Sequence, residues 1–409
     1  MGDIRPQSRD EFRVAILCAL PPEAEAVLDL FDCFWDDDCD AYGKAANDPN
    51  DYRTGRIGQD HVVLCITGVG KARAATATSF LLSSYTRVQR AFVVGICGGV
   101  PRPNRHDAGA EILLGDVIIS SAVVQFDLGR RYHGGYFEIR TSTQDRLGNA
   151  DPSLAAQLRS LHTIHNKDRL EECAARFLSE LQEKRPGQYD YPGTAQDRLY
   201  PSNYHHRHRG TEPCGCTDER PCAAATMVPC PDVGCEETMI VTPRQQPAQK
   251  RQLEGARKTL GTQAQAPAVH IGSIASGDTV MKSAEVRDQI AEAHGVIGFE
   301  MEAAGVWDLP QLACVVVKGV CDYADSHKNK TWQSFASAAA ASVMKGMLRH
   351  RVRTDERPPL STIDGETKRS SDFRGKTGKV SSLAYLPLHQ QNPEHHASCK
   401  TWSTKTKLP

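Results

Sequence analysis

The sequence predicts an α/β fold: a single three-layer domain in which a central mixed, mostly parallel β-sheet is flanked by helices. Two observations carry this prediction. Continuous apolar runs of strand length recur along the chain, as at 13–19 and 313–320, and such runs are typical of strands buried on both faces. Segments with helical signals lie between these runs. Apolar strands that alternate with helices favour a largely parallel sheet.

The individual elements follow from local signals, beginning at the N-terminus. After the first strand, Pro21 and Pro22 with Glu23 open a helix to about Leu30, since proline is tolerated in the first turn and an acid is favoured there. The other elements expected before residue 184 are strands at 61–67, 91–99 and 115–124 and helices at 72–82 and 152–183. Those expected after residue 265 are a strand at 268–275, helices near 282–293 and 300–309, a strand at 313–320 and a helix at 331–350.

One catalytic domain at 13–350, preceded by an N-terminal tail at 1–12, fits the pattern better than two domains. The stretch from about 184 to 265 is rich in Pro, Gly, Gln, Arg and Cys and has little periodicity. Such a composition predicts a disordered, low-complexity insertion. Residues 351–409 are basic and rich in Ser and Thr, which predicts a second disordered segment, a C-terminal tail.

Composition excludes several classes of partner. The formal net charge of -1 implies no general attraction to nucleic acid. No window approaches eighteen consecutive apolar residues, and the N-terminus lacks the apolar core of a secretory signal. Five of the 14 cysteines lie in apolar strand-like runs, where free cysteine behaves as a small hydrophobe. We therefore expect a reduced, cytoplasmic protein without a disulfide framework, a membrane partner or a nucleic-acid partner.

Two neighbouring segments carry acidic side chains in positions typical of an active site. Glu300 and Glu302 flank Met301 at the start of an apolar helix, and Asp322 ends the valine-rich run that begins near Val315. An acid at the end of a buried strand lies at the carboxyl edge of the sheet, where open α/β sheets bind small ligands. This pattern indicates an active site.

Several separated segments together resemble the nucleoside phosphorylase/nucleosidase superfamily, whose members cleave or exchange the N-glycosidic bond of nucleosides. The resemblance is closest to fungal nucleoside phosphorylase domain proteins, often found in larger signalling proteins, and to methylthioadenosine/adenosylhomocysteine nucleosidases. It implies the fold described above and covers 13–350 apart from the insertion. The matching segments, in the order typical of the family, are 14–23, 67–71, 95–99, 115–117, 276–278, 299–304 and the strand that ends at Asp322.

The resemblance implies roles for the acidic residues. Asp322 matches the acid that protonates the departing base, and burial of its carboxyl would favour the proton-bearing form near neutrality. Glu302 matches the acceptor of the ribose hydroxyls, Met301 would pack under the sugar, and Glu300 would support them. The alternatives are an N-cap role for Asp322, a core position for Met301 and a solvated position for Glu302.

Glu23 bears on which reaction occurs. In nucleosidases of this superfamily a glutamate one turn past the first strand activates the attacking water, and Glu23 matches that position. Phosphorylases carry an arginine and a serine around the third strand, where this chain has Val93 and Ile96. Because phosphate needs cationic partners or several donors, hydrolysis is favoured over phosphorolysis. The alternative is that Glu23 only stabilises the helix N-terminus.

The remaining candidates would line the ligand. Gly95, Cys97 and Gly98 form a glycine-rich turn whose backbone amides could approach a sugar or base closely. Phe137 lies where members of the family place a ring against the base, and Val280 lies in a segment resembling the one that lines the base pocket.

The insertion also contains cysteines and histidines, among them His206 and His208. The cysteine spacing is C-x-C-x5-C-x7-C-x4-C, which matches no paired C-x2-C zinc framework. We therefore assign no metal ligands and no cofactor from the sequence.

The leading hypothesis is a metal-independent hydrolase that cleaves the N-glycosidic bond of a purine nucleoside or nucleotide in nucleoside catabolism or signalling. One alternative is a phosphorylase that produces ribose 1-phosphate. An alternative of another class is a signalling module that senses a nucleoside or nucleotide without turnover. The expected partner is a small nucleoside or nucleotide. A homo-oligomer is compatible with the resemblance, because members of the family are commonly oligomeric.

Overall fold

The computed structural model describes most of the chain between Arg5 and Arg349. The described ranges are 5–36, 42–103, 111–140, 152–210, 214–217, 220–241, 266–309 and 312–349. The expected C-terminal tail at 351–409 and the second part of the expected insertion, 242–265, lie outside them.

A nine-stranded mixed sheet forms the centre of the protein, with the strand order β10-β9-β6-β11-β5-β1-β4-β3-β2. Its middle strands are continuous apolar runs, as the sequence predicts for strands covered on both faces. The strands are β1 (Val14–Cys18), β2 (Cys33–Phe34), β3 (Tyr52–Ile57), β4 (Asp60–Ile66), β5 (Arg90–Gly99), β6 (Val117–Gln125), β9 (Val269–Ser276), β10 (Val296–Glu300) and β11 (Ala313–Asp322).

The sheet closes on itself around β5. Strand β10 pairs in parallel with β9 and also antiparallel with β5, where Phe299 is opposite Gly98. Strands β5, β11, β6, β9 and β10 therefore form a closed ring, while β1, β4, β3 and β2 extend from β5 as an open wing. Asp322 is also opposite Gly98, on the other side of β5. The ring thus brings the ends of β10 and β11 to one short stretch of β5.

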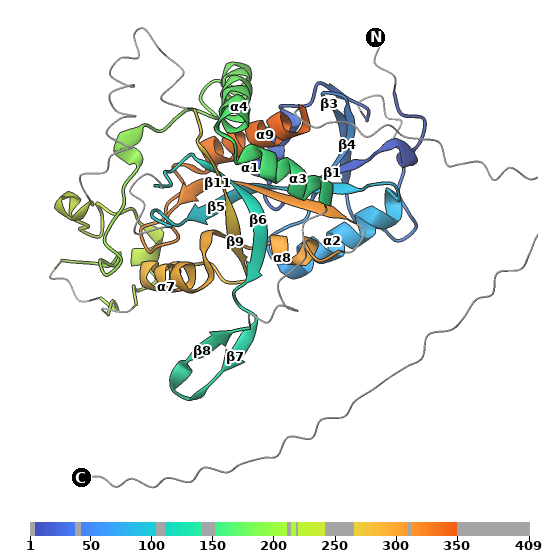
Figure 1. Cartoon of the computed structure of the whole chain (residues 1–409). Coiled ribbons are helices and arrows are strands. Elements are labelled where there is room, and N and C mark those ends of the chain that lie inside the picture. The colour runs from blue at the N-terminus through green and yellow to red at the C-terminus, as the bar shows by residue number, and fades with distance from the viewer. Residues whose placement is uncertain are drawn as a thin grey trace, which may run out of the picture. The chain divides into compact units, whose positions relative to one another are not determined.

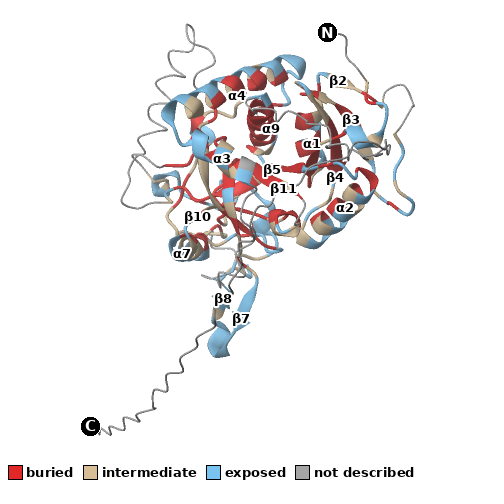
Figure 2. Ribbon diagram, turned by 45° about the vertical axis from the view of Figure 1, so that its right-hand side comes forward, coloured by how far each residue is buried: buried red, intermediate tan, exposed pale blue. Residues whose placement is uncertain are grey.

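Helices cover both faces of the sheet and give the three-layer fold that the sequence predicts (Figure 1). On one face α9 contacts α1, α4, β5 and β11, and on the other α2 contacts α8. Nearly all of α9 is buried, so this alanine-rich helix belongs to the core. Figure 2 shows α1 and α9 largely buried, while α2 and α4 keep exposed outer faces. The helices are α1 (Pro21–Leu28), α2 (Lys71–Ser84), α3 (Pro152–Leu161), α4 (Ile164–Lys184), α7 (Ala284–His294), α8 (Ala303–Val306) and α9 (Gln333–Arg349).

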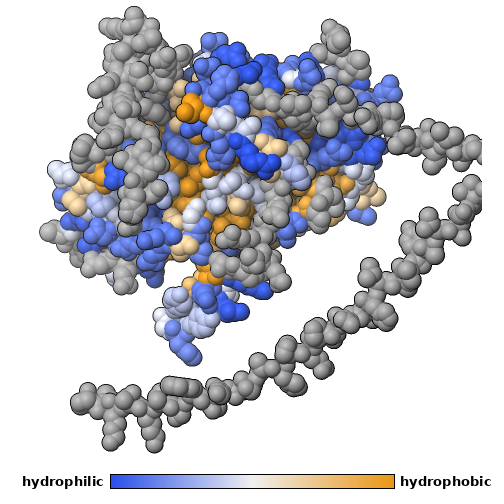
Figure 3. Space-filling view, in the orientation of Figure 1, coloured by the Kyte–Doolittle hydropathy of each residue, from blue (hydrophilic) through white to orange (hydrophobic). Residues whose placement is uncertain are grey.

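Beyond β6 the chain forms a two-stranded hairpin, β7 (Gly129–Arg131) and β8 (Phe137–Ile139), which the sequence signals did not predict. It projects from the body of the protein in both ribbon views (Figures 1 and 2). In the face drawn in Figure 3 its tip is hydrophilic to intermediate, while hydrophobic residues show at its base.

Two expectations require correction. The helix expected at 300–309 is instead the end of β10, through Glu300, followed by the single turn of α8. The segment expected to be a disordered insertion is packed onto the domain over its described residues: Tyr189 and Leu199 are buried in the main core, and Tyr200, Ala225, Val233 and Cys235 form a small core of their own. Scattered aromatic and apolar residues without periodicity thus suffice to anchor this segment.

No described helix is long and apolar enough to cross a membrane.

Candidate active site

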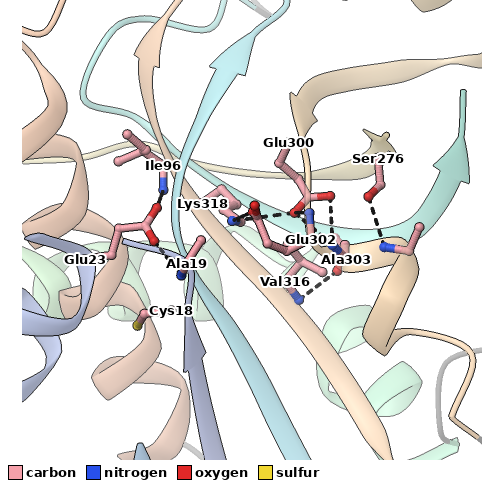
Figure 4. Close-up of polar contacts among 12 residues, drawn as sticks. Cys18, Ala19, Glu23, Ile96, Ser276, Glu300, Glu302, Ala303, Val316 and Lys318 are labelled. Carbon is pink, nitrogen blue, oxygen red and sulfur yellow. Dashed lines mark hydrogen bonds and ion pairs between the residues drawn. The ribbon is translucent and has the colours of Figure 1, made fainter. Parts of the chain in front are cut away.

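Glu23 is held in the first turn of α1 by backbone donors from the turn after β1 and from β5. Its Oε2 accepts hydrogen bonds from the amides of Ala19 (2.8 Å) and Leu20 (2.9 Å), and its Oε1 accepts one from Ile96 (2.9 Å; Figure 4). A Cβ on Gly95 would collide with this carboxylate, so glycine is required there. Burial raises the pKa of the Glu23 carboxyl, against the opposing attraction of Lys318. Glu23 therefore caps the helix and also faces the interior of the site.

Lys318 is the residue that the sequence analysis missed. It interrupts the valines of β11 and is fully buried, with its Nζ 2.9 Å from Glu302 Oε2 and 3.5 Å from Glu300 Oε2. Burial alone would lower the pKa of Lys318, but the attraction of Glu302, Glu300 and Glu23 outweighs burial and raises it. A lysine inside a run of valines was the available signal, since a buried lysine requires a partner.

The two glutamates around Met301 differ in their partners. Glu300, at the end of β10, accepts hydrogen bonds from the amides of Glu302 and Ala303, and burial raises the pKa of its carboxyl. Glu302 accepts from Lys318 and, through Oε1, from the amide of Gly70 (3.2 Å), which precedes α2. The solvated alternative for Glu302 is wrong, because its side chain is only 7% exposed. Glu300 thus fixes the backbone that presents Glu302.

These contacts create a buried site with more acids than bases. Figure 4 draws Lys318 with Glu23 on one side and Glu300 and Glu302 on the other. One ammonium cannot neutralise three ionised carboxylates, so each additional negative charge is costly at this depth. A ligand that develops positive charge would relieve that cost.

Asp322 lies at the carboxyl end of β11, as predicted. Its Oδ1 accepts a hydrogen bond from the amide of Ala324 (2.8 Å), and its Oδ2 is 3.2 Å from Lys328 Nζ. A Cβ on Gly98 would come within 2.9 Å of the Asp322 carboxylate, so this strand pair also depends on glycine. Ala324 has a φ of 50°, a left-handed conformation that is uncommon for a residue with a side chain. The loop that follows Asp322 is therefore a tightly held turn.

A cavity of about 690 Å³ borders Asp322 on the side that faces the packed segment before residue 241. The cavity is lined by strand-end and loop residues such as Tyr323 and Lys328 and by residues 226–231 of the packed segment. A separate apolar cluster contains Phe126, Phe299 and Ala324, with the rings of the first two packed edge to face at 5.6 Å between centroids. Asp322 thus borders the cavity, while Ala324, two residues further along the chain, belongs to the apolar cluster.

The other predicted site residues have different surroundings. Cys97 and Gly98 lie within β5, between β10 and β11, and Met301 is half-buried beside the glutamates. Val280 is 51% exposed, and Phe137 lies on the projecting hairpin beside the guanidinium of Arg131. The structure therefore does not bring Phe137 to the carboxylates. Contacts of Cys97, Gly98, Met301 and Val280 with a ligand remain predictions.

The comparisons agree with this architecture. Residues 13–178 match the family model described as the Phosphorylase superfamily, which covers β1, Glu23, β5 and β6. This match over residues 13–178 agrees with the resemblance that the sequence motifs show.

One curated relative is a nucleotide-binding leucine-rich repeat (NLR)-like protein of Hyaloscypha variabilis, 29% identical over 352 residues. The match covers 83% of this chain but only 29% of that protein, so the chain spans less than a third of its length.

Solved structures of similar fold include two 5'-methylthioadenosine/S-adenosylhomocysteine nucleosidases. The one from Neisseria meningitidis is 17% identical, with a TM-score of 0.45 and coverage of 82% of this chain and 98% of that one. The one from Streptococcus pneumoniae is 17% identical, with a TM-score of 0.46 and coverage of 83% and 99%. Futalosine hydrolase of Helicobacter pylori is 15% identical, with a TM-score of 0.42 and coverage of 84% and 100%.

Proposed function

We propose that this protein hydrolyses the N-glycosidic bond of a purine nucleoside or nucleotide. The observation that carries the proposal is the buried group of Glu23, Glu302 and Lys318, in which Lys318 belongs to the same strand, β11, that ends at Asp322. Breaking a ribosyl C1′–N bond develops positive charge on the sugar and negative charge on the base. The excess of carboxylates suits the first charge, and an acid at Asp322 suits the second.

The steps divide among the side chains as follows. The C1′–N bond breaks with its electron pair moving to the base, and Asp322 supplies a proton to a ring nitrogen of that base. Water then attacks C1′, and Glu23 accepts the proton that the water loses. Glu302 accepts hydrogen bonds from the ribose hydroxyls, while Lys318 keeps its carboxylate in position. The products are the free base and the free sugar.

Hydrolysis is favoured over phosphorolysis by the charges around the cluster. Lys318 is already bonded to Glu302 and close to Glu300, so its ammonium is not available to a phosphate dianion. The side chain of Val93 is buried in the core, so this position offers a phosphate no cation. A phosphate would instead meet the carboxylates of Glu23, Glu300 and Glu302.

The test is a panel of nucleosides and nucleotides incubated with the purified chain, with released base measured by chromatography. In phosphate buffer we expect free ribose rather than ribose 1-phosphate. Asp322→Asn should lose at least about 100-fold in kcat, because general acid catalysis is worth about 10² to 10⁴. Glu25→Gln, an exposed change on the same helix as Glu23, is the matched control. Phosphate-dependent formation of ribose 1-phosphate would identify a phosphorylase instead.

A second candidate function is a nucleoside-sensing module without turnover. It is favoured by the three backbone donors that already occupy Glu23 and by the ion pair between Asp322 and Lys328. Similarity to part of an NLR-like protein is compatible with such a role. Calorimetry decides between the two: saturable binding of a nucleoside that is recovered intact after prolonged incubation would establish the sensing module.

A further inference from the structure

Four side chains that could bind a metal converge outside the carboxylate cluster. His206, Cys230 and Cys235 come from the packed segment at 186–241, and His327 comes from the loop after Asp322. Their ligand atoms all lie within 4.8 Å of one another. The residues are buried or half-buried, and Cys235 and His206 are less than a tenth exposed. Two imidazoles and two thiols in one pocket are the ligand set of a Cys₂His₂ zinc site.

The distances fit one ion at the centre. Each Nδ1 lies 3.5 Å from the Cys230 sulfur and 3.7 Å from the Cys235 sulfur, for both His206 and His327. In a tetrahedral zinc site with ordinary Zn–S and Zn–N bonds, sulfur and nitrogen ligands are about 3.6 Å apart. All four sulfur–nitrogen edges are therefore close to the length that zinc requires.

The histidine rings are oriented by their other nitrogens. His206 Nε2 lies 2.8 Å from the carbonyl oxygen of Ala225, and His327 Nε2 lies 2.7 Å from that of Tyr204. A carbonyl oxygen only accepts, so each Nε2 carries the proton and each Nδ1 presents a lone pair to the sulfurs. Such backbone partners are usual for zinc-bound histidines, because they fix the tautomer and the direction of the ring.

We propose that His206, Cys230, Cys235 and His327 bind a structural zinc ion that fastens the segment at 186–241 to the loop following Asp322. Three ligands come from the segment and one from the loop, so the ion would join parts of the chain about a hundred residues apart. Other contacts connect the same two parts of the chain. The amide of His206 donates to Ser326 Oγ (2.9 Å), and the ring of Tyr200 stacks on His327 at 4.0 Å between centroids.

A second group lies a few residues away. His208 Nδ1 is 3.5 Å from Cys222 Sγ and 3.8 Å from Cys216 Sγ, and the three ligand atoms lie within 4.8 Å of one another. These three residues offer a Cys₂His set, which supplies three of the four ligands of a tetrahedral zinc ion. The same proposal assigns them a second zinc ion.

The two sites explain why the cysteine spacing was uninformative. His206 and His208 are separated by one residue but belong to different sites. Cys216 and Cys222 belong to the site of His208, whereas Cys230 and Cys235 belong to the site of His206. The fourth ligand of the first site, His327, lies outside the segment altogether. A search for paired C-x2-C motifs cannot detect sites assembled in this way.

The first site would also position the candidate active site. His327 is followed directly by Lys328, whose ammonium lies 3.2 Å from Asp322, and the loop borders the cavity next to that carboxylate. Fixing His327 restricts the backbone that carries Lys328. His327 lines the cavity and its amide donates to Asp325 Oδ1 (2.9 Å), but its effect on Asp322 acts through Lys328, so it is a positioning residue here.

Metal content tests the proposal on the whole chain, purified under reducing conditions without chelator. We expect about two equivalents of zinc per chain, one in the four-ligand site and one in the group of His208, Cys216 and Cys222, because thiolate and imidazole ligands bind zinc tightly. Cobalt(II) exchanged into the protein should give the absorption of tetrahedral cobalt with thiolate charge-transfer bands. Zinc content should fall by about one equivalent in Cys235→Ser and in Cys222→Ser, and remain unchanged in Cys33→Ser, a half-buried cysteine remote from both sites.

A conservative exchange separates ligation from folding. His206→Cys should keep the zinc and strengthen the cobalt thiolate bands, whereas His206→Ala should lose one equivalent. Absence of bound zinc together with absence of tetrahedral cobalt spectra in the reduced wild-type chain would overturn the proposal. A Cys230–Cys235 disulfide detected by mass spectrometry, with no metal uptake after its reduction, would also overturn it and indicate a redox pair instead.

Discussion

Lys318 Nζ lies 2.9 Å from Glu302 Oε2 at a depth where the lysine is fully buried. The pair joins β11 to the turn that follows β10, two strands that are not neighbours in the sheet but meet across β5. The ion pair is therefore part of what closes the ring of strands around the candidate site.

Removing the lysine should be strongly destabilising. Lys318→Met leaves the buried carboxylate of Glu302 without its cation, and breaking a buried ion pair costs about 3–5 kcal/mol. Urea unfolding measures the change in the free energy of unfolding. Lys184→Met, which removes an exposed partner of Asp29, should cost at most about 1 kcal/mol. The double variant Lys318→Met/Glu302→Gln should regain part of the lost stability. If Lys318→Met and Lys184→Met lowered the free energy of unfolding equally, burial of the Lys318 pair would not matter.

Stability should depend on pH through Glu23. Burial raises the pKa of its carboxyl in the folded protein, so between the unfolded value of about 4.5 and the raised value the native state holds a proton that the unfolded chain has lost. The free energy of unfolding then falls as pH rises through that window, by up to about 1.4 kcal/mol per pH unit for one proton. Glu23→Gln should reduce this slope by the share of one carboxyl, while Glu300, whose pKa burial also raises, keeps its own share. Urea midpoints between pH 4.5 and 8 test it, with Glu25→Gln as the control that keeps the wild-type slope.

Gly95 should tolerate no side chain. In Gly95→Ala the new Cβ collides with the Glu23 carboxylate, which must then move away from the amide of Ile96. We expect a loss of about 1–3 kcal/mol in stability, as in other overpacked cores, and a fall in kcat. Thermal unfolding and the base-release assay measure both. Gly210→Ala, at a site with open space around it, is the control. If Gly95→Ala were as stable and as active as Gly210→Ala, the Glu23 carboxylate would not be confined by Gly95.

Substitutions of Phe126, which precedes the hairpin, and of Phe137, which lies in its second strand, should differ in their effect on activity. Phe126 packs against Phe299 in the apolar cluster next to Ala324, whereas Phe137 lies on the projecting hairpin. Phe126→Ala should therefore raise KM or lower kcat at least tenfold. Phe137→Ala should leave both within about twofold of wild type, since removing contacts far from the reacting atoms costs little binding energy. A large effect of Phe137→Ala alone would restore the base-contact role that the resemblance implies.

The fold class was predictable because β1, β4, β5, β6, β9 and β11 are largely apolar runs, which local sequence shows directly. The strands β2, β3 and β10 were not predicted, because they are short or contain polar residues and glycine. The termination of β11 at Asp322 and the position of Glu23 after β1 followed from the same signal. The ring closure was not predictable, since the pairing of β10 with β5 joins residues about two hundred positions apart. Lys318 was missed because a single lysine does not alter the strand pattern around it. The packed segment at 186–241 was missed because its core consists of isolated aromatic residues and Cys/His clusters rather than a periodic face.

The closed ring has a consequence for how the site assembles during synthesis. Residues 13–178, the part that matches the superfamily, contain Glu23, Gly95 and the strand β5, but none of Glu302, Lys318 and Asp322. Until β10 and β11 have left the ribosome, β5 has unpaired edges and Glu23 lacks its cation. Such long-range pairing is formed late and slowly in folding. The nascent N-terminal half therefore holds only part of the candidate site, which is completed when the C-terminal strands pair with β5.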